Sequence, residues 1–203
     1  MPETGISRIL ITDTSSLITL AVADSLDYLT VGGIQIIIPD AVYYEATFDV
    51  QKMGASDIIE WTQKNSHTVQ IIPTSIFAEQ IIRIEQGEPR QRNLGESAAL
   101  EIARDTSLIN GDGQAFILTE DDAVLDGGFI HSNEKRRIIV ISTYDFLVAL
   151  EAEQLINSAD AVYMLAADAG RLASRRRTEK DRHNTAVAAI KDIIQRQTER
   201  AKP

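Results

Sequence analysis

Five short, continuous apolar runs rich in β-branched residues divide the chain and predict five strands, at 9–12, 34–38, 69–72, 116–119 and 138–141. Runs that are continuous rather than alternating are typical of parallel strands buried on both faces. The segments between them have helical spacing, at 16–29, 40–48, 55–64, 76–86, 96–104 and 121–125. Strands and helices that alternate in this way predict an α/β domain with right-handed crossovers.

Beyond the fifth strand the pattern is wholly helical, with helices expected at 144–154 and 159–172 and a last helix near the end. The apolar positions of that last helix recur at helical spacing, at Ala186, Val187, Ile190, Ile193 and Ile194. Such a stripe must be covered, so we expect a homo-oligomer. We divide the chain into a domain of residues 1–174 and a basic amphipathic helical extension of residues 175–203.

Charge is unevenly distributed along the chain. The net charge of −10 argues against a general nucleic-acid coat, because phosphate binding needs Lys and Arg. Residues 175–203, however, hold nine basic and four acidic side chains, so the tail carries +5 and the remainder −15. This asymmetry indicates an interaction segment or, as the commoner alternative, a solvated charged helix.

The chain has no cysteine, so thiolate metal sites and disulfides are excluded. Its start lacks a basic region followed by a long apolar segment, and no stretch approaches the roughly 20 apolar residues of a membrane helix. We therefore expect a cytoplasmic protein with no membrane partner.

Acidic residues recur where the predicted strands end. Asp13 directly follows the first strand, and Asp121 and Asp122 follow the fourth. Glu45 comes shortly after the second strand, and Glu96 opens a helix. The carboxyl ends of strands line the ligand crevice of open α/β sheets, so these acids are expected where chemistry usually takes place.

Any one of these acids could simply cap a helix or lie in its first turn. Together they indicate a site, because two carboxylates about 4 Å apart repel by roughly 4 kcal/mol at an effective dielectric constant near 20. Four that converge require a cation or proton uptake. Oxygen ligands without cysteine, and with only three scattered histidines, favour Mg²⁺ or Mn²⁺ over zinc.

Four short motifs resemble those of the PIN-domain family, which includes the ribonuclease toxins of toxin–antitoxin modules. They occur in the expected order, as Asp-Thr-Ser-Ser-Leu-Ile at 13–18, Val-Tyr-Tyr-Glu at 42–45, Gly-Glu-Ser-Ala-Ala-Leu at 95–100 and Thr-Glu-Asp at 119–121. The chain departs from many relatives after the last acid, where the aspartate pair Asp121-Asp122 lacks the Ala-Arg that often follows.

The resemblance implies a three-layer α/β/α domain with a mostly parallel five-stranded sheet that hydrolyses RNA with Mg²⁺ or Mn²⁺. It implies that Asp13, Glu96 and Asp121 bind the metal directly or through water. Glu45 would complete the pocket. Asp122 stays an alternative to Asp121 as the aspartate that faces the metal.

Residues around the acids have supporting roles in this interpretation. The hydroxyls of Ser15 and Thr119 are candidates to hold the carboxylates in place. Arg83, Arg90 and Arg92 could contact the RNA, although a plain solvated loop explains them equally well.

Three functions remain open from the sequence. The first is a metal-dependent ribonuclease, expected to be a toxin or toxin-like enzyme with a protein antitoxin as partner. The second is a catalytically silent PIN-like module that binds RNA or protein. The third is a phosphoryl-accepting receiver-like domain, in which Glu45 and Glu96 would have no role.

Overall fold

The computed structural model describes residues 8–31, 33–89, 91–105, 108, 113–126, 130–131, 133–134, 137–173, 184 and 187–195. Its five strands form one parallel sheet in the order β3-β2-β1-β4-β5. The strands are β1 (Arg8–Thr12), β2 (Gln35–Pro39), β3 (Val69–Ile72), β4 (Gln114–Thr119) and β5 (Ile138–Ser142). Every predicted strand is confirmed, with its ends shifted by two residues at most.

Nine helices connect and cover the strands in the described part of the chain, in addition to a helical stretch at 187–195. They are α1 (Thr14–Val22), the 3₁₀ helix η1 (Leu26–Thr30), α2 (Asp40–Thr47), α3 (Ala55–Lys64), α4 (Ser75–Glu85), α5 (Leu94–Arg104), α6 (Asp122–Leu125), α7 (Thr143–Ala152) and α8 (Ala159–Asp168). Most were predicted to within two residues at each end.

Two helix predictions were wrong in length. The helix expected at 16–29 ends at Val22, because Asp24 takes a left-handed conformation with a φ of 51° and the chain restarts as η1. The helix expected at 159–172 ends at Asp168, before Gly170 with a φ of 91°. The apolar spacing continued past Val22 because Leu26 on η1 is also buried.

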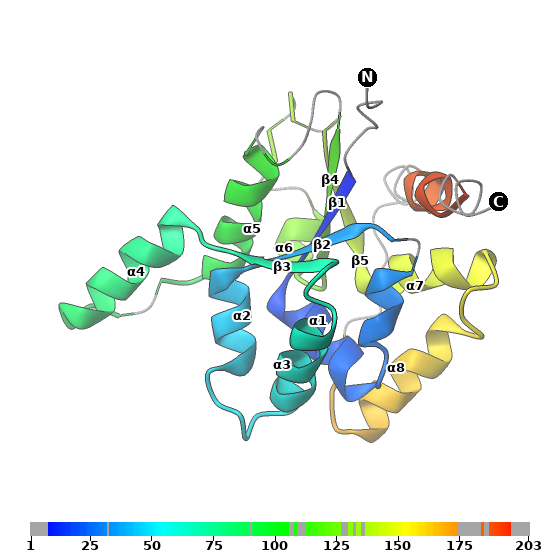
Figure 1. Cartoon of the computed structure of the whole chain (residues 1–203), viewed down its shortest axis with the longest axis horizontal. Helices are drawn as coiled ribbons and strands as arrows, with labels where there is room; N and C mark the ends of the chain where they lie inside the picture. The colour runs from blue at the N-terminus through cyan, green and yellow to red at the C-terminus, as the bar shows by residue number, and fades with distance from the viewer. Residues whose placement is uncertain are drawn as a thin grey trace.

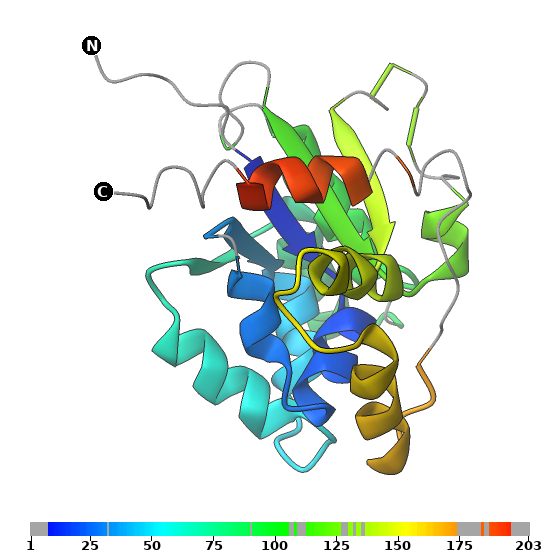
Figure 2. The same ribbon diagram turned by 90° about the vertical axis from the view of Figure 1, so that its right-hand side faces the viewer.

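The sheet has an apolar core on each face. Leu10, Phe116 and Ile141 pack on one face with α1, α7 and α8, whereas Ile11 and Ile117 pack on the other with α5 and α6. Helices cover both faces of the sheet (Figures 1 and 2). The chain is therefore the three-layer α/β/α domain that was predicted, and its sheet is entirely parallel. No helix in the described ranges has the length and apolarity needed to cross a membrane.

The helix at 187–195 packs against the body of its own chain. Ile190, Ile193 and Ile194 are buried in the same apolar cluster as residues of α7 and α8, and Figure 2 shows the helix lying across that side of the sheet. Asp192 accepts a 2.7 Å ion-pair hydrogen bond from Arg8 at the start of β1. The stripe from Val187 onward is thus covered, and Ala186 lies outside the described residues. The covered stripe no longer argues for an oligomer, which stays a prediction, as does the domain division at 174.

The strand order places a crevice at one edge of the sheet. From β1 the chain continues to β2 and β3 on one side, and later to β4 and β5 on the other. Ligands of such sheets bind outside the carboxyl ends of the strands at this reversal point, here between β1 and β4. The backbone N–H of Asp13 donates to the carbonyl of Leu118 at 3.0 Å, which joins the two strand ends.

Candidate functional site

Asp13 is the N-cap of α1 and lies directly after β1, where it lines the crevice. Its Oδ1 accepts from the backbone N–H of Ser16 at 2.7 Å, so the capping role weighed from the sequence is real. Its Oδ2 accepts from the Thr119 hydroxyl at 2.6 Å and from the Glu120 N–H at 3.3 Å. Burial raises the pKa of Asp13, and these hydrogen bonds partly oppose that rise. The carboxylate is thereby fixed in one orientation.

Asp121 is the N-cap of α6. Its Oδ1 accepts from the N–H groups of Ala123 and Val124 at 2.7 and 3.1 Å. Its own N–H donates to the Thr119 hydroxyl at 3.0 Å, so that hydroxyl joins the segments of Asp13 and Asp121. The Thr119 hydroxyl therefore holds the Asp13 carboxylate in place, as expected, and it accepts from the backbone of Asp121.

Glu96 lies in the first turn of α5 and is partly buried. Burial raises the pKa of its carboxyl most, its own backbone N–H lowers it, and the charges of Asp121, Asp13 and Glu45 raise it further. Those three acids come from the ends of β4 and β1 and from α2. The charges of the other three predicted carboxylates therefore all reach Glu96. Among the aspartate pair it is Asp121 whose charge reaches Glu96, whereas Asp122 is exposed on α6.

Glu45 is brought to the site by the close packing of α2 against the start of α5. Its Oε2 accepts from the Thr14 hydroxyl at 2.9 Å. A Cβ added to Gly95 would lie 3.2 Å from Cγ2 of Val42 and 3.8 Å from Oε2 of Glu45. The absence of a side chain at Gly95 therefore lets Glu45 and Glu96 line the same cavity.

That acidic cavity has a volume of about 240 Å³ and is lined by residues of α1, α2 and α5, including Asp13, Ser15, Glu45 and Glu96. Ser15 thus lies at the site, although the hydrogen bonds to Asp13 come from other residues. The cavity wall also includes Arg171, a residue that the sequence analysis did not single out.

Arg171 follows the end of α8 and points back toward the strand ends. Its Nη2 lies 3.5 Å from Oε2 of Glu120 and 3.4 Å from the carbonyl of Ser15. Its Nε donates to the Thr19 hydroxyl at 3.3 Å. The chain turns at Gly170, just after α8, and this glycine is the feature of the sequence that indicates the turn. Arg171 brings a positive charge to an otherwise acidic wall.

Comparison with known protein families decides how this arrangement is classified. A family model described as a PIN domain matches residues 9–112, which is half of the chain. The chain belongs to the PIN-domain family. Searches of curated proteins and of solved structures found no match. The matched range includes Asp13, Glu45 and Glu96, whereas Asp121 lies beyond it and is placed at the site by the fold.

Membership in the family supports a nuclease-type module, since PIN domains are generally nucleases and typically use divalent metals. It also removes the receiver-like alternative. In the described part of this PIN domain, no three Asp, Glu, His or Cys side chains are grouped closely enough to hold a metal ion. The charges of the other acids reach Glu96, but the described carboxylates are not close enough together to surround a metal ion.

The donor set nevertheless fits a divalent metal of the hard type. Carboxylate oxygens without sulfur are the ligands that Mg²⁺ and Mn²⁺ prefer. Asp13 and Asp121 are held in place by backbone and hydroxyl donors. Glu45 is exposed and Glu96 half-buried, so these two side chains have room to turn toward the aspartates.

The arginines predicted to contact RNA are placed differently from one another. Arg92 lines a second cavity of about 320 Å³ that shares Glu45 and Glu96 with the acidic cavity. Arg83 is exposed near the end of α4. Arg90 lies outside the described residues, as do the basic residues 175–177.

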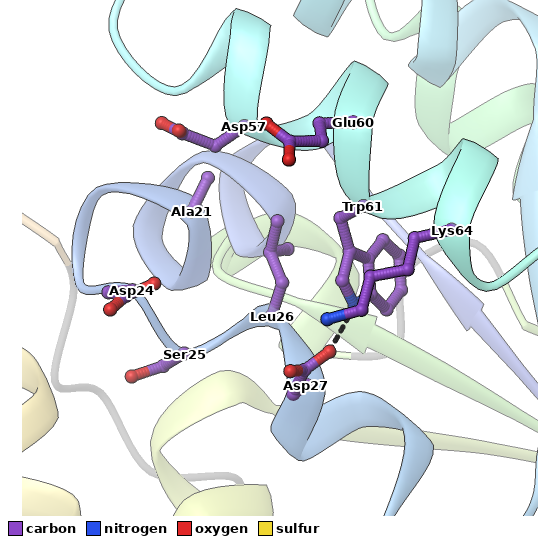
Figure 3. A pocket seen from close by; sticks show the side chains of 9 residues that line it. All are labelled: Ala21, Asp24, Ser25, Leu26, Asp27, Asp57, Glu60, Trp61 and Lys64. Carbon is purple, nitrogen blue, oxygen red and sulfur yellow. Dashed lines mark hydrogen bonds between the residues drawn. The ribbon is translucent and has the colours of Figure 1, made fainter.

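A third cavity, of about 200 Å³, lies apart from the predicted acids, where α3 packs beside the end of α1 and η1 (Figure 3). Trp61 is buried there and donates from its indole N–H to Oδ1 of Asp27 at 3.0 Å. Asp57 and Glu60 extend from α3 at its rim. None of the residues predicted for the site lines this cavity, and Trp61 serves to pack α3 on the core.

Proposed function

We propose that this PIN domain is a Mg²⁺- or Mn²⁺-dependent endoribonuclease that hydrolyses phosphodiester bonds in RNA. Asp13, Glu96 and Asp121 hold the metal directly or through water, and Glu45 completes the pocket. The observation that carries the proposal is that Asp13, Glu45 and Glu96 line one cavity, with Asp121 near enough for its charge to act on Glu96. Clustered acids whose charges are left unpaired are typical of functional sites.

A divalent ion bound among these acids would supply an activated water and neutralise charge developing on the phosphate. The chain's own residues prepare the site. Thr119 orients Asp13 and is bonded to the N–H of Asp121, so both aspartates keep their positions. Glu45, exposed beside Glu96, is the carboxylate best placed to orient a water molecule.

Arg171 supports the proposal as a basic side chain that lines the acidic cavity. An acidic wall alone would repel the phosphates of RNA, and phosphate contacts are usually made by arginine and lysine. The guanidinium lies between Glu120 and the carbonyl of Ser15, with its side chain 27% exposed. We assign it to a phosphate next to the bond that is cleaved, with Arg92 as a second contact.

The narrower part of the proposal is a toxin role, with a protein antitoxin as partner in the cytoplasm. It rests on the resemblance of the motifs to those of toxin–antitoxin ribonucleases. Production of the chain in a bacterial host is expected to arrest growth, and production of Asp13→Asn is not. Equal growth with both forms would contradict the toxin role and leave the nuclease proposal standing.

The nuclease proposal is tested with purified protein and end-labelled RNA. Wild type is expected to cleave with Mn²⁺ or Mg²⁺ and to stop in EDTA, whereas Asp13→Asn is inactive under all conditions. Glu134→Gln, at the opposite end of the sheet, is the control and should cleave like wild type. Cleavage that persists both in EDTA and in Asp13→Asn would overturn the mechanism.

The open arrangement of the acids favours one other candidate function. A catalytically silent PIN module that binds RNA or protein needs no closed metal cage, and none is present among the described residues. Such a module would bind labelled RNA with the same affinity in Mn²⁺ and in EDTA and would leave it intact. The same assay therefore separates the two functions.

A further inference from the structure

The second cavity adjoins the acidic cavity. It lies between α2, α4 and α5, and the two cavities share Glu45 and Glu96. A group that fills it must therefore lie beside the proposed catalytic acids. Its walls combine two aromatic rings, Tyr44 and Phe77, with amide side chains and Arg92. This is the composition of a site for a flat polar ring rather than for a purely apolar group.

The aromatic wall extends to the molecular surface. The ring of Tyr44 stacks on Phe48 at a centroid distance of 5.5 Å and an angle of 20°, and it meets Phe77 at 5.3 Å. Tyr44 and Phe48 are 36% and 46% exposed. Nζ of Lys52 lies 4.3 Å from the centroid of the Phe48 ring. Aromatic rings that stay open to solvent beside a basic side chain are a common platform for the bases of single-stranded RNA.

Gln80 provides an independent observation within the same cavity. It is the one buried residue of α4, at 1% exposed, on a helix whose other residues are exposed or half-buried. Its Oε1 accepts from the backbone N–H of Gln91 at 3.1 Å, which fixes the orientation of the amide. Its Nε2 has no hydrogen-bond partner among the described residues. A buried donor without a partner is costly, and because Gln80 lines this cavity, a small shift of its amide would let a ligand atom that accepts remove that cost.

We propose that the second cavity is a nucleobase subsite for the RNA substrate, next to the cleaved phosphodiester bond. Tyr44 and Phe77 contact the face of the base, and Nε2 of Gln80 donates to a carbonyl oxygen on its edge. The inference rests on the proposed ribonuclease function and adds its base preference. Uracil O4 and guanine O6 accept at the edge position where cytosine N4 and adenine N6 donate. The subsite therefore favours uracil or guanine.

A purely structural role for Gln80 makes a different prediction. In that role the side chain only holds the loop before α5 through Gln91. The Gln80→Glu carboxylate still accepts from the Gln91 N–H but cannot donate when ionised, so it keeps the loop contact and changes the base contact. Gln86→Glu, a matched substitution at an exposed position just after α4, controls for the added charge.

The test is cleavage of a random-sequence RNA pool in Mn²⁺, followed by sequencing of the new ends. Wild type is expected to prefer uracil or guanine at one position beside the cut by about tenfold. Gln80→Glu should lose or reverse this preference, and Gln86→Glu should keep it. Tyr44→Leu should lower cleavage about tenfold for every base while the preference stays. Identical preferences in wild type and Gln80→Glu would overturn the subsite.

Binding of labelled oligouridine and oligocytidine in EDTA, followed by fluorescence anisotropy, separates the two proposals. Cleavage without any effect of Gln80→Glu on base preference refutes the subsite alone. A uridine preference in binding that depends on Gln80, without cleavage by wild type in Mn²⁺, supports the subsite and refutes the nuclease. If wild type neither cleaves nor binds, both are wrong.

Discussion

The two ends of α5 place acidic side chains in opposite electrostatic environments. At its last residue, Arg104 forms two hydrogen bonds with Glu134, of 2.8 and 3.1 Å. This pairing, with the His131 N–H, lowers the pKa of Glu134 to about 2. At its first turn, burial raises the pKa of Glu96, and the charges of Asp121 and other acids raise it further. One end neutralises its carboxylate within the protein, whereas the other keeps like charges together.

This difference separates structural charge from functional charge. A surface ion pair such as Arg104–Glu134 contributes little to stability, typically 0–1 kcal/mol by general measurement, and needs no ligand. Carboxylates that repel one another reduce stability unless something relieves them. The crevice end of α5 is therefore the end at which a bound cation has an effect, and substitutions at the two ends should differ in kind.

The largest expected effect is on cleavage by Asp121→Asn. The amide keeps a similar shape but removes one negative charge from the crevice, so RNA cleavage should fall about a thousandfold, the scale of losing a transition-state contact. Asp122→Asn, one residue further on, is the matched control and should stay within about threefold of wild type. Initial rates on labelled RNA in Mn²⁺ measure both. A larger loss in Asp122→Asn would show that the wrong aspartate has been assigned to the metal.

A smaller loss is expected from Arg171→Ala. Among the described residues, Arg171 is the cation that lines the acidic cavity, and its removal should lower kcat/KM about 10- to 100-fold, mainly through KM, with partial recovery in Arg171→Lys. The slope of log affinity against log salt for single-stranded RNA should also decrease by about 0.7, as for one lost phosphate contact. Arg104→Ala, which breaks the ion pair at the other end of α5, should change neither. An unchanged salt slope in Arg171→Ala would make its role structural.

Gly95→Ala tests the close packing that brings α2 and α5 together. The added methyl would lie 3.2 Å from Cγ2 of Val42, so an overpacking cost of about 1–3 kcal/mol should exceed the roughly 0.5–1 kcal/mol that alanine gains over glycine in a helix, and cleavage should fall several-fold. Denaturant unfolding measures the stability. The cost should shrink in a Val42→Ala background, which removes the opposing methyl, and strictly additive effects would contradict this contact.

The smallest effects are on stability, and their sign depends on pH. Because the pKa of Glu96 is raised in the folded protein, ionising it opposes folding; this cost is absent below the ordinary value of 4.5 and complete above the folded-state pKa. Glu96→Gln should therefore raise Tm by a few degrees at pH 7 in EDTA and leave it unchanged near pH 4.

Glu134→Gln should do the opposite. Its pKa is lowered from 4.5 to about 2, so the stability that its carboxylate contributes is present above pH 4.5 and lost as pH falls toward 2. Tm at pH 7 should thus decrease slightly. Thermal unfolding of both variants across pH 3–8 measures the contrast, and shifts of the same sign at pH 7 would contradict it.

Much of this arrangement could be predicted from the sequence because it depends on local patterns. Continuous apolar runs identified all five strands, and a parallel sheet necessarily gathers the residues that follow β1 and β4 at one edge. Asp13 and Asp121 were predicted for the site for that reason. Glu96 was predicted because it opens a helix after a glycine.

The remainder depends on contacts between distant segments. The stripe at Ile190 was visible, but a pattern does not tell whether its own chain or a second copy covers it. Arg171 reaches the site only because Gly170 reverses the chain after α8. The sequence of α4 does not show that Gln80 is buried, because its burial depends on how α4 packs against the rest of the domain. The break at Asp24 was missed because a left-handed aspartate leaves no apolar signature.

Calorimetric titration of Mn²⁺ into metal-free protein at pH 7 tests the central claim, that the crevice acids repel one another until a cation binds. Wild type and Glu134→Gln are expected to bind Mn²⁺ with the same affinity, and Glu96→Gln at least tenfold more weakly. Equal binding by Glu96→Gln and wild type, or no binding by wild type, would contradict the account.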